Sequence, residues 1–279
     1  MTTIEWTDAT WNPTRGCSRI SPGCVHCYAE RMAIRLSGRG RPYEGLVRSG
    51  PQGVRWTGKV VLDRQALEAP LHWKTPRRVF VNSMSDLFHE SLSDEQIADV
   101  FNIMAQTPQH TYQVLTKRSE RMRNWFERVP GGSPRRPWLS PHIWIGVSVE
   151  SDDYVSRLLN LLEVPAAVRF ASLEPLLSEP RQLLEWLPRL DWVIVGGESG
   201  PGARPFRVEW ADAVRRTCAE YRVPFFCKQL GARPERRPLS PTGDSPLIPM
   251  GLKDRKGGDP DEWPPSLRVR QFPPTERTP

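Results

Sequence analysis

Three of the five cysteines stand close together near the start of the sequence. Cys17, Cys24 and Cys27 have the spacing C-x6-C-x2-C. Clustered cysteines in a reducing compartment bind metal or do chemistry more often than they form a disulfide framework. A structural zinc site uses four tetrahedral ligands, whereas a [4Fe–4S] cluster held by three thiolates keeps one iron with an open position. The spacing therefore indicates either a zinc site with a distant fourth ligand or a cluster that can bind a further group.

A fourth zinc ligand would have to be His26, Cys218 or Cys227. His26 lies between two of the clustered cysteines and would be strained if it bound the same ion. Cys218 stands in a helical run and Cys227 in an apolar, strand-like run. Buried thiols in such places usually act as small hydrophobic groups. We expect Cys218 and Cys227 to lie in the core.

Six short runs of β-branched and aromatic residues follow the cysteines and alternate with amphipathic helical segments. The runs lie at 78–83, 111–117, 142–149, 168–175, 191–197 and 223–229. Each is apolar nearly throughout, which is typical of strands buried on both faces of a sheet. Ser93 and Gln96 predict a capping box before one of the helices. With a further strand before Cys17, the alternation predicts an α/β fold built as a complete or partial parallel (β/α) barrel.

Polar residues follow each predicted strand. The carboxyl ends of barrel strands meet on one face, so these residues are expected to surround one cavity that the cysteine loop also faces. Any single one of them also fits a chain that simply turns at the end of a strand. The candidates are Asn82, Ser83, Asp86, Lys117, Ser148, Glu150, Glu174, Gly196, Gly197, Glu198 and Lys228.

The segment "GGESGPGARP" has two interpretations. A glycine-rich turn after a strand can hold phosphate, but this one matches neither G-x-G-x-x-G nor the P-loop, and Glu198 would repel an anion. The alternative is that Gly196 and Gly197 let the backbone approach adenine or substrate closely, with Glu198 as a polar contact.

The balance of charge favours polyanionic partners. The net charge is +7, and the arginines are grouped at 77–78, 118–123 and 233–237, where they could surround one opening. Eleven tryptophans are available for stacking on bases. A solvated basic surface and core tryptophans are the alternative.

The composition divides the chain into a main domain and a tail. Residues 1–230 hold the predicted barrel, with the cysteine loop at 17–27 and an insertion around 38–58. Residues 231–279 hold 11 of the 29 prolines and are expected to form a tail or lid, anchored by Trp263 and Phe272. The start of the sequence lacks the regions of a signal peptide, and no apolar run approaches the ~18 residues of a membrane span. We expect a cytoplasmic protein with no membrane partner.

The cysteine loop, Tyr28 directly after it and the β/α series resemble the radical S-adenosylmethionine (SAM) superfamily. This sequence departs from the superfamily pattern in one respect. Six residues separate its first two cysteines, whereas the common superfamily spacing is C-x3-C-x2-C. Across almost the whole chain, motifs such as "IEWTDATWNPTRGC", "SPGCVHCYAERM", "VFVNSMSDLFH" and "VIVGGESGPGARP" resemble a phage-associated family of three-cysteine-motif proteins.

The superfamily resemblance implies a barrel of the radical SAM type and a role for each candidate. Cys17, Cys24 and Cys27 would hold a [4Fe–4S] cluster, whose electron would cleave SAM to a 5′-deoxyadenosyl radical. Residues near the strand ends would bind the cofactor, with Asn82, Ser83 and Asp86 as acceptors for its amine. The other implied cofactor-binding residues are Tyr28, Lys117, Ser148, Glu150, Gly196 and Gly197. The implied catalytic residues are Glu174, Glu198 and Lys228.

An enzyme of this kind needs an electron donor of the flavodoxin or ferredoxin type. Charge and tryptophan content favour a nucleic-acid base or nucleotide as its substrate, through modification or repair-lyase-like chemistry. Two other functions stay open. One is a zinc-stabilised nucleic-acid-binding protein without catalysis, and the other is a barrel enzyme that uses Lys and Glu side chains while the cysteines are structural.

Overall fold

The structure is a computed structural model that describes residues 4–51, 53–128, 140–238 and 245–274. Contacts within the chain divide it into two compact units. Unit 1 comprises Met1–Val147 with Leu159–Arg169, and unit 2 comprises Ser148–Leu158 with Phe170–Pro279. The boundary predicted at residue 230 stays a prediction, and parts of the predicted tail, residues 239–244 and 275–279, lie outside the described residues.

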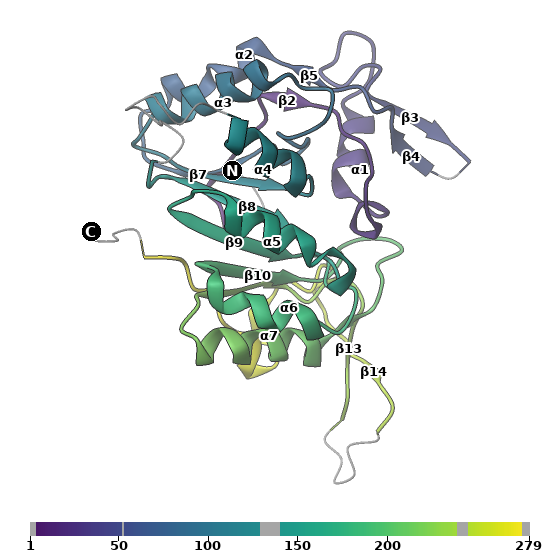
Figure 1. Ribbon diagram of the computed structural model, residues 1–279. Coiled ribbons are helices and arrows are strands. Elements are labelled where there is room, and N and C mark those ends of the chain that lie inside the picture. Colours follow the sequence, from purple (N-terminus) through teal and green to yellow (C-terminus); the bar gives the residue numbers. More distant parts are fainter. Residues whose placement is uncertain (1–3, 52, 129–139, 239–244, 275–279) are drawn as a thin grey trace. The chain divides into compact units, whose positions relative to one another are not determined.

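Strands and helices alternate along the first half of the chain. The elements are β1 (Ala9–Trp11), β2 (Thr14–Arg15), α1 (Tyr28–Arg35), β3 (Val47–Gly50), β4 (Gly53–Trp56), β5 (Val61–Leu62), α2 (Arg64–Leu67), β6 (Arg78–Val81), α3 (Asp94–Gln106), β7 (Thr111–Thr116), α4 (Ser119–Arg128), β8 (Ile143–Ser148) and α5 (Ser156–Glu163). In unit 1, α2 and α3 lie on one side of β7 (Figure 1).

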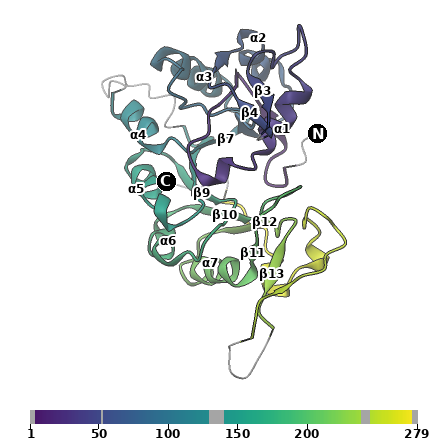
Figure 2. The same cartoon turned by 90° about the vertical axis from the view of Figure 1, so that its right-hand side faces the viewer.

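The second half continues the alternation. Its elements are β9 (Val168–Leu173), α6 (Arg181–Trp186), β10 (Trp192–Gly196), β11 (Phe206–Arg207), α7 (Val208–Glu220), β12 (Phe225–Gln229), β13 (Pro234–Arg236) and β14 (Ile248–Pro249). Helix α7 packs against β10 and β12 and lies beside α6 (Figures 1 and 2).

The main sheet has seven strands in the order β1-β6-β7-β8-β9-β10-β12. Within unit 1, β1, β6, β7 and β8 pair in parallel, and Val81 of β6 lies opposite Trp11 and Val114. Within unit 2, β9, β10 and β12 pair in parallel, with Ile194 of β10 opposite Ser172 and Phe226. All residues of β8 and β10 are buried, as the continuous apolar runs predict. The predicted α/β fold with a parallel sheet is confirmed.

Helix α3 begins where the sequence predicts. The Ser93 hydroxyl accepts a hydrogen bond from the Gln96 backbone N–H, and the Gln96 side chain accepts one from the Ser93 N–H. The helix then buries Ile97, Phe101 and Met104 against the sheet side of unit 1. The predicted capping box is confirmed.

The insertion at 38–58 folds into a β-hairpin. Strands β3 and β4 pair antiparallel, from Val47 opposite Trp56 to Gly50 opposite Gly53. Trp56 and Val47 are buried in a cluster with Ala33 of α1 and with Tyr43. The hairpin therefore rests on the helix that follows the cysteine loop.

The chain after β14 returns to the edge of the main sheet. The N–H of Cys227 donates to Val269, and the N–H of Gln271 donates to Phe225, so residues 269–271 lie along β12. Trp263 is buried and donates from its indole N–H to Gly257. Phe272 packs against Trp192 and Phe226. None of the helices in the described ranges has the length and apolar character that a membrane span requires.

Candidate functional site

Hydrogen bonds fix the backbone at the end of β2, where the cysteine loop begins. The Thr14 hydroxyl donates to Ser85 Oγ at 2.9 Å, and Ser85 Oγ donates to the Gly16 carbonyl at 2.7 Å. Gly16 has a φ of 93°, and a Cβ there would lie 2.1 Å from the Lys59 carbonyl oxygen. Only glycine fits this position, which therefore sets the direction in which the loop leaves β2.

The three clustered thiols are free and half-buried. The pKa of Cys17 is raised to about 12, chiefly by burial and also by the nearby Asp86, against the lowering effect of Arg118. Cys27 stands at the N-cap of α1, where its side chain makes no capping hydrogen bond, and the nearby backbone N–H groups of Ala29 and Glu30 lower the pKa of its thiol. Burial raises the pKa of Cys27 as well, against the effect of these donors and of the Lys117 charge. Cation binding at these sulfurs must therefore displace protons.

The thiols are not arranged around a single point. Within the described ranges, no group of three or more His, Cys, Asp or Glu side chains is placed to hold one metal ion. Cys24 contributes to the electrostatic environment of both Cys17 and Cys27, so the three sulfurs share one neighbourhood. A [4Fe–4S] cluster gives each thiolate an iron of its own, so its ligands need not converge on one ion.

Arg118, just after β7, holds the cysteine loop through hydrogen bonds to Ser18. Its Nη2 donates to the Ser18 carbonyl at 3.2 Å and to Ser18 Oγ at 2.7 Å. Its Nη1 lies 3.9 Å from Cys17 Sγ. The same guanidinium donates to Asp86 and Glu90, and its side chain is only 3% exposed. A buried cation therefore stands beside the first thiol, where it stabilises negative charge on sulfur.

Asp86 is the acceptor that holds this arrangement together. Its Oδ1 accepts from the Thr116 hydroxyl at 2.6 Å and from the Phe88 N–H at 3.0 Å. Its Oδ2 accepts from the Lys117 N–H and from Arg118 Nη1, both at 3.1 Å. The carboxylate that the sequence predicted to receive a ligand amine thus already has four donors from its own chain.

His89 contacts the same loop. Its Nδ1 accepts from the Ser91 N–H at 3.1 Å, so the neutral ring carries its proton on Nε2, which lies 2.9 Å from Ser18 Oγ. Burial lowers the pKa of His89, and the charge of Arg118 lowers it further. A neutral imidazole therefore completes the support of Ser18.

Asn82 directly follows β6, and its buried side-chain donor has no partner in the described part of the chain. Its φ is 60°, a conformation that asparagine tolerates better than most residues. Its Oδ1 accepts from the Thr14 N–H at 3.3 Å, which fixes the orientation of the amide. Among the described residues, Nδ2 has no hydrogen-bond partner. The sequence predicted an acceptor for an amine here, whereas the side chain offers an N–H donor.

Ser83 and Tyr28 join the end of β6 to the start of α1. The Tyr28 hydroxyl donates to the Ser83 carbonyl at 2.6 Å. Ser83 Oγ donates to Asn12 Oδ1 at 3.2 Å. Both residues therefore help to hold the helix after the last cysteine against the sheet of unit 1.

In unit 2, Glu150 is a fully buried carboxylate. Arg157 Nη1 donates to it at 2.8 Å and to the Ser148 carbonyl at 2.7 Å. The Arg157 guanidinium also lies over the Tyr154 ring. Ser148 and Glu150 are thus brought together by one arginine, which the sequence analysis did not identify.

Glu174 and Lys228 form an ion pair at the end of the unit 2 strands. The two side chains are 19% and 13% exposed. Gly196 of β10 lies beside them, and a Cβ there would come 3.4 Å from the Glu174 carboxyl carbon. Three predicted site residues, from β12 and from the ends of β9 and β10, therefore meet in one place.

Gly197 and Glu198 make contacts with other residues of unit 2. A Cβ on Gly197 would lie 2.3 Å from the Leu230 carbonyl oxygen, so the close backbone approach predicted here is an approach to the chain's own backbone. Glu198 accepts from the Arg204 backbone N–H at 2.9 Å and forms an ion pair with its guanidinium. Whether these residues also contact a ligand stays a prediction.

The predicted site residues thus fall into two groups. Those in unit 1 are Cys17, Cys24, Cys27, Tyr28, Asn82, Ser83, Asp86 and Lys117, and those in unit 2 are Ser148, Glu150, Glu174, Gly196, Gly197, Glu198 and Lys228. The geometry within each group is described above. That all of them surround one cavity stays a prediction.

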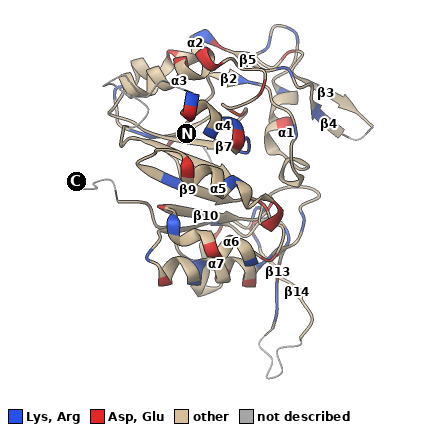
Figure 3. Cartoon of the chain, viewed as in Figure 1, with Lys and Arg blue, Asp and Glu red and all other residues tan. Residues whose placement is uncertain are grey.

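The predicted ring of arginines is wrong for one of its clusters. Arg77 and Arg78 stand at the amino end of β6, whereas Arg118 follows the carboxyl end of the adjacent β7. Arg78 pairs with Asp8, Arg121 with Asp94 and Arg123 with Glu163. Acidic residues accompany basic ones along the helices (Figure 3). Much of the positive charge is therefore neutralised locally.

Sequence reasoning counted Arg118 as surface charge and did not consider Arg157. Arg118 meets Asp86 and Glu90, which stand 32 and 28 residues away in sequence. Arg157 follows Glu150 by seven residues, a spacing that brings them together only if the chain turns sharply after β8. Cys218 and Cys227 are fully buried in α7 and β12, as the sequence predicts.

Comparisons with known proteins give three findings. No curated protein matches the chain. A solved structure described as "Spore photoproduct lyase complexed with dinucleoside spore photoproduct" is similar, with 10% identity and a TM-score of 0.38, over 74% of this chain and 59% of that chain.

The chain spans less than two thirds of that relative, and the similarity is weak. The resemblance to phage-associated three-cysteine proteins is not confirmed. A family model described as "Protein of unknown function (DUF5131)" matches residues 1–257. The chain belongs to this family.

Proposed function

We propose that this protein is a radical SAM enzyme that holds a [4Fe–4S] cluster through Cys17, Cys24 and Cys27. The main support is the setting of the thiols, with Arg118 Nη1 3.9 Å from Cys17 and with the backbone N–H groups of Ala29 and Glu30 lowering the pKa of Cys27. These donors stabilise negative charge on sulfur, which an anionic iron–sulfur–thiolate assembly requires. When bound, such a cluster supplies the electron that cleaves SAM to a 5′-deoxyadenosyl radical.

The donor set fits a cluster better than a zinc ion. Three free thiols share one neighbourhood without converging on one point. The two remaining cysteines are buried in the core of unit 2. A cluster with three protein thiolates keeps an open coordination position, at which a ligand amine and carboxylate can bind.

Residues at the end of β6 and β7 bind and orient the cofactor in this proposal. The unpartnered Nδ2 of Asn82 donates to the methionine carboxylate, which needs a donor in a partly buried place. Lys117 adds positive charge near Cys27. Asp86, with its four donors, acts through Arg118 as a positioning residue.

In this proposal the unit 2 residues bind the ribose and transfer protons. Glu150, oriented by Arg157, and Ser148 offer acceptors for ribose hydroxyls. The Glu174–Lys228 ion pair offers an amine and a carboxylate side by side for proton transfer to or from a substrate. Gly196 lies against the Glu174 side chain, whereas Gly197 and Glu198 shape the turn that follows β10.

The proposed substrate is a nucleic-acid base or nucleotide, supported by the net charge of +7. The cluster must be reduced before each cleavage, so the protein needs an electron donor of the flavodoxin or ferredoxin type. The chemistry on the substrate is modification or a lyase reaction.

Anaerobic reconstitution tests the proposal. Protein treated with iron, sulfide and reductant should bind about four irons per chain and form 5′-deoxyadenosine from SAM. Cys17→Ala, Cys24→Ala and Cys27→Ala should each lose iron and SAM cleavage. Cys218→Ala and Cys227→Ala are the matched controls and should keep both.

Two outcomes contradict the proposal. Stoichiometric zinc with no iron after reconstitution would favour the zinc-stabilised alternative. Full iron content in any of the three loop variants would show that its thiol is not a ligand.

A further inference from the structure

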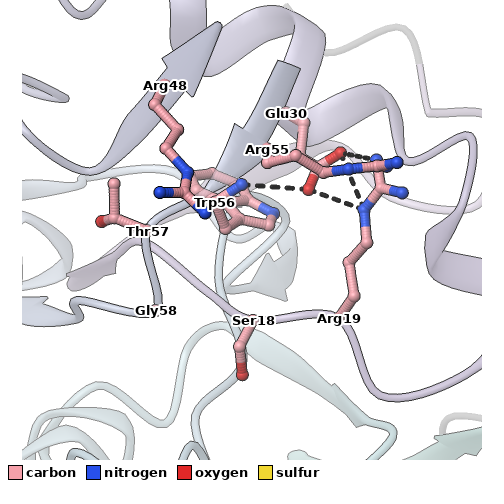
Figure 4. Close-up of a pocket in the computed structure, with 8 residues that line it drawn as sticks. All are labelled: Ser18, Arg19, Glu30, Arg48, Arg55, Trp56, Thr57 and Gly58. Atoms are coloured by element: carbon pink, nitrogen blue, oxygen red, sulfur yellow. Dashed lines mark hydrogen bonds and ion pairs between the residues drawn. The ribbon is translucent and has the colours of Figure 1, made fainter. Parts of the chain in front are cut away.

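A basic pocket lies beside the cysteine loop, within unit 1. Its volume is about 380 Å³. Ser18 and Arg19 of the cysteine loop, Glu30 of α1, and Arg48 and Arg55 of the β3–β4 hairpin contribute to its walls (Figure 4). The sequence analysis assigned none of these residues to a site.

The only carboxylate among the pocket residues is fully engaged. Glu30 is 2% exposed. It accepts from Arg19 Nε at 2.9 and 3.1 Å and forms an ion pair with the same guanidinium (Figure 4). It also accepts from the Trp56 N–H at 3.1 Å. Glu30 therefore balances Arg19, and the pocket residues include two further arginines, Arg48 and Arg55, but no second carboxylate.

Arg48 and Arg55 stand directly opposite each other on adjacent strands. Like charges in this arrangement repel each other and destabilise a hairpin. The guanidinium of Arg48 has no hydrogen-bond or ion-pair partner in the described part of the chain. The hairpin carries basic residues and no acidic ones (Figure 3). An anion between the two guanidinium groups would remove the repulsion and form paired N–H···O bonds.

We propose that this pocket binds a backbone phosphate of a nucleic-acid strand. Two guanidinium groups on one face match the paired oxygens of a phosphate. The chain on either side of that phosphate can continue outward, because Arg48, Ser49 and Gly50 are exposed. A free nucleotide would lack a stacking surface, because Trp56 is buried and packs against Tyr43.

The pocket would hold a strand next to the cysteine loop. Ser18 of the pocket follows Cys17, and Glu30 lies three residues after Cys27. This inference rests on the proposed function for one point only, namely that the bound strand carries the substrate. Phosphate binding itself needs no cluster, so the two proposals can fail separately.

The test uses the full chain purified in air, without reconstitution. Fluorescence anisotropy with a 5′-labelled single-stranded DNA 20-mer is measured across a salt series. Arg48→Gln and Arg55→Gln should each weaken binding roughly five- to ten-fold at low salt, and should lower the slope of log K against log salt by about 0.7 for each lost phosphate contact. Arg48→Lys should keep the salt slope but lose part of the affinity, because the ammonium keeps the charge without the paired N–H donors.

Arg216→Gln is the matched control, since it removes the same charge from an exposed position on α7. Its affinity and salt slope should equal those of the wild type, and no variant should unfold at a lower urea midpoint than the wild type. Unchanged binding in Arg48→Gln and Arg55→Gln would overturn the proposal. An equal loss in the control would do the same, because it would reveal general charge attraction.

Competition separates a strand from a small phosphate. Unlabelled 20-mer should displace the probe, whereas inorganic phosphate and AMP at the same phosphate concentration should not. Equal displacement by AMP or inorganic phosphate would overturn the assignment to a strand.

Discussion

Arg118 and Asp86 form a buried ion pair, with Nη1 of the guanidinium 3.1 Å from Oδ2 of the carboxylate. The same guanidinium also pairs with Glu90, whose side chain is 62% exposed, whereas that of Asp86 is 8% exposed. One arginine thus holds a buried and an exposed carboxylate, and the cysteine loop depends on its position.

Removal of the two carboxylates should have unequal effects. Asp86→Ala leaves a buried cation poorly compensated and takes the acceptor from Thr116 and Lys117, so it should cost roughly 3 kcal/mol of unfolding free energy. Glu90→Ala removes an exposed partner and should cost less than about 1 kcal/mol. Urea unfolding of the apoprotein measures both. Equal losses would mean that the burial of Asp86 has no energetic consequence.

Asn82→Asp isolates the unpartnered amide nitrogen. Aspartate keeps the acceptor for the Thr14 N–H and replaces only Nδ2 with oxygen. In reconstituted protein we expect full iron content and SAM affinity lower by about ten-fold, because a donor to the methionine carboxylate is lost. Anaerobic calorimetry gives the affinity, with Ser83→Ala as the control that removes a hydroxyl nearby. Wild-type affinity in Asn82→Asp would place the methionine carboxylate elsewhere.

The turn after β10 should tolerate no side chain at Gly197. Gly197→Ala puts a Cβ 2.3 Å from the Leu230 carbonyl oxygen, and the shift that relieves this contact should cost about 1–3 kcal/mol. Gly251→Ala is the control, because a Cβ there has no atom within 4 Å. Thermal unfolding should separate the two variants, and matching midpoints would contradict the close approach.

Cys218 and Cys227 should resist alkylation in the folded protein. Burial raises the pKa of both thiols to about 12, so at pH 8 almost no reactive thiolate is present. Iodoacetamide at pH 8 followed by mass spectrometry should find both unmodified in buffer and both modified in urea. Rapid labelling of either thiol in buffer would show that its element opens readily.

Stability should fall on mild acidification because of His89. Burial and then Arg118 lower its pKa below the ordinary value of 6.5, so the unfolded chain takes up a proton at a pH where the folded protein does not. The contribution of His89 is present above pH 6.5 and is lost as the pH falls towards the folded pKa. Urea midpoints at pH 7.5 and 5.5 measure the loss.

His110 also has a pKa lowered by burial, so the two histidines must be separated. His89→Gln should remove part of the loss between the two pH values, and His110→Gln should remove another part. An unchanged loss in His89→Gln would contradict a neutral imidazole at Ser18.

The sequence predicts the elements well, because they depend on local patterns. Continuous apolar runs mark β8 and β10, and Ser93 with Gln96 marks the start of α3. The hairpin inside the 38–58 insertion was missed, because the sequence between Gly50 and Gly53 is not one of the dipeptides that mark a tight hairpin.

The site is less predictable, because its contacts join residues that are distant in sequence. The three cysteines are visible as a motif, but the partners of Arg118 stand about 30 residues away and become apparent only when β6 and β7 are side by side. The unpartnered nitrogen of Asn82 likewise depends on which atom Thr14 contacts. Composition could not distinguish Arg118, which is neutralised, from Arg48, which has no ion-pair partner among the residues that the structure describes.

The segment at 269–271 lies along the outer edge of β12, the last strand in the order of the main sheet. A parallel sheet that ends in an open strand offers a row of backbone donors and acceptors to other chains. Here the chain's own backbone occupies part of that row at Phe225 and Cys227, and Phe272 covers the adjoining aromatic rings. Removal of residues 269–272 would therefore expose the backbone groups of Phe225 and Cys227 at this edge, together with the Phe226 ring.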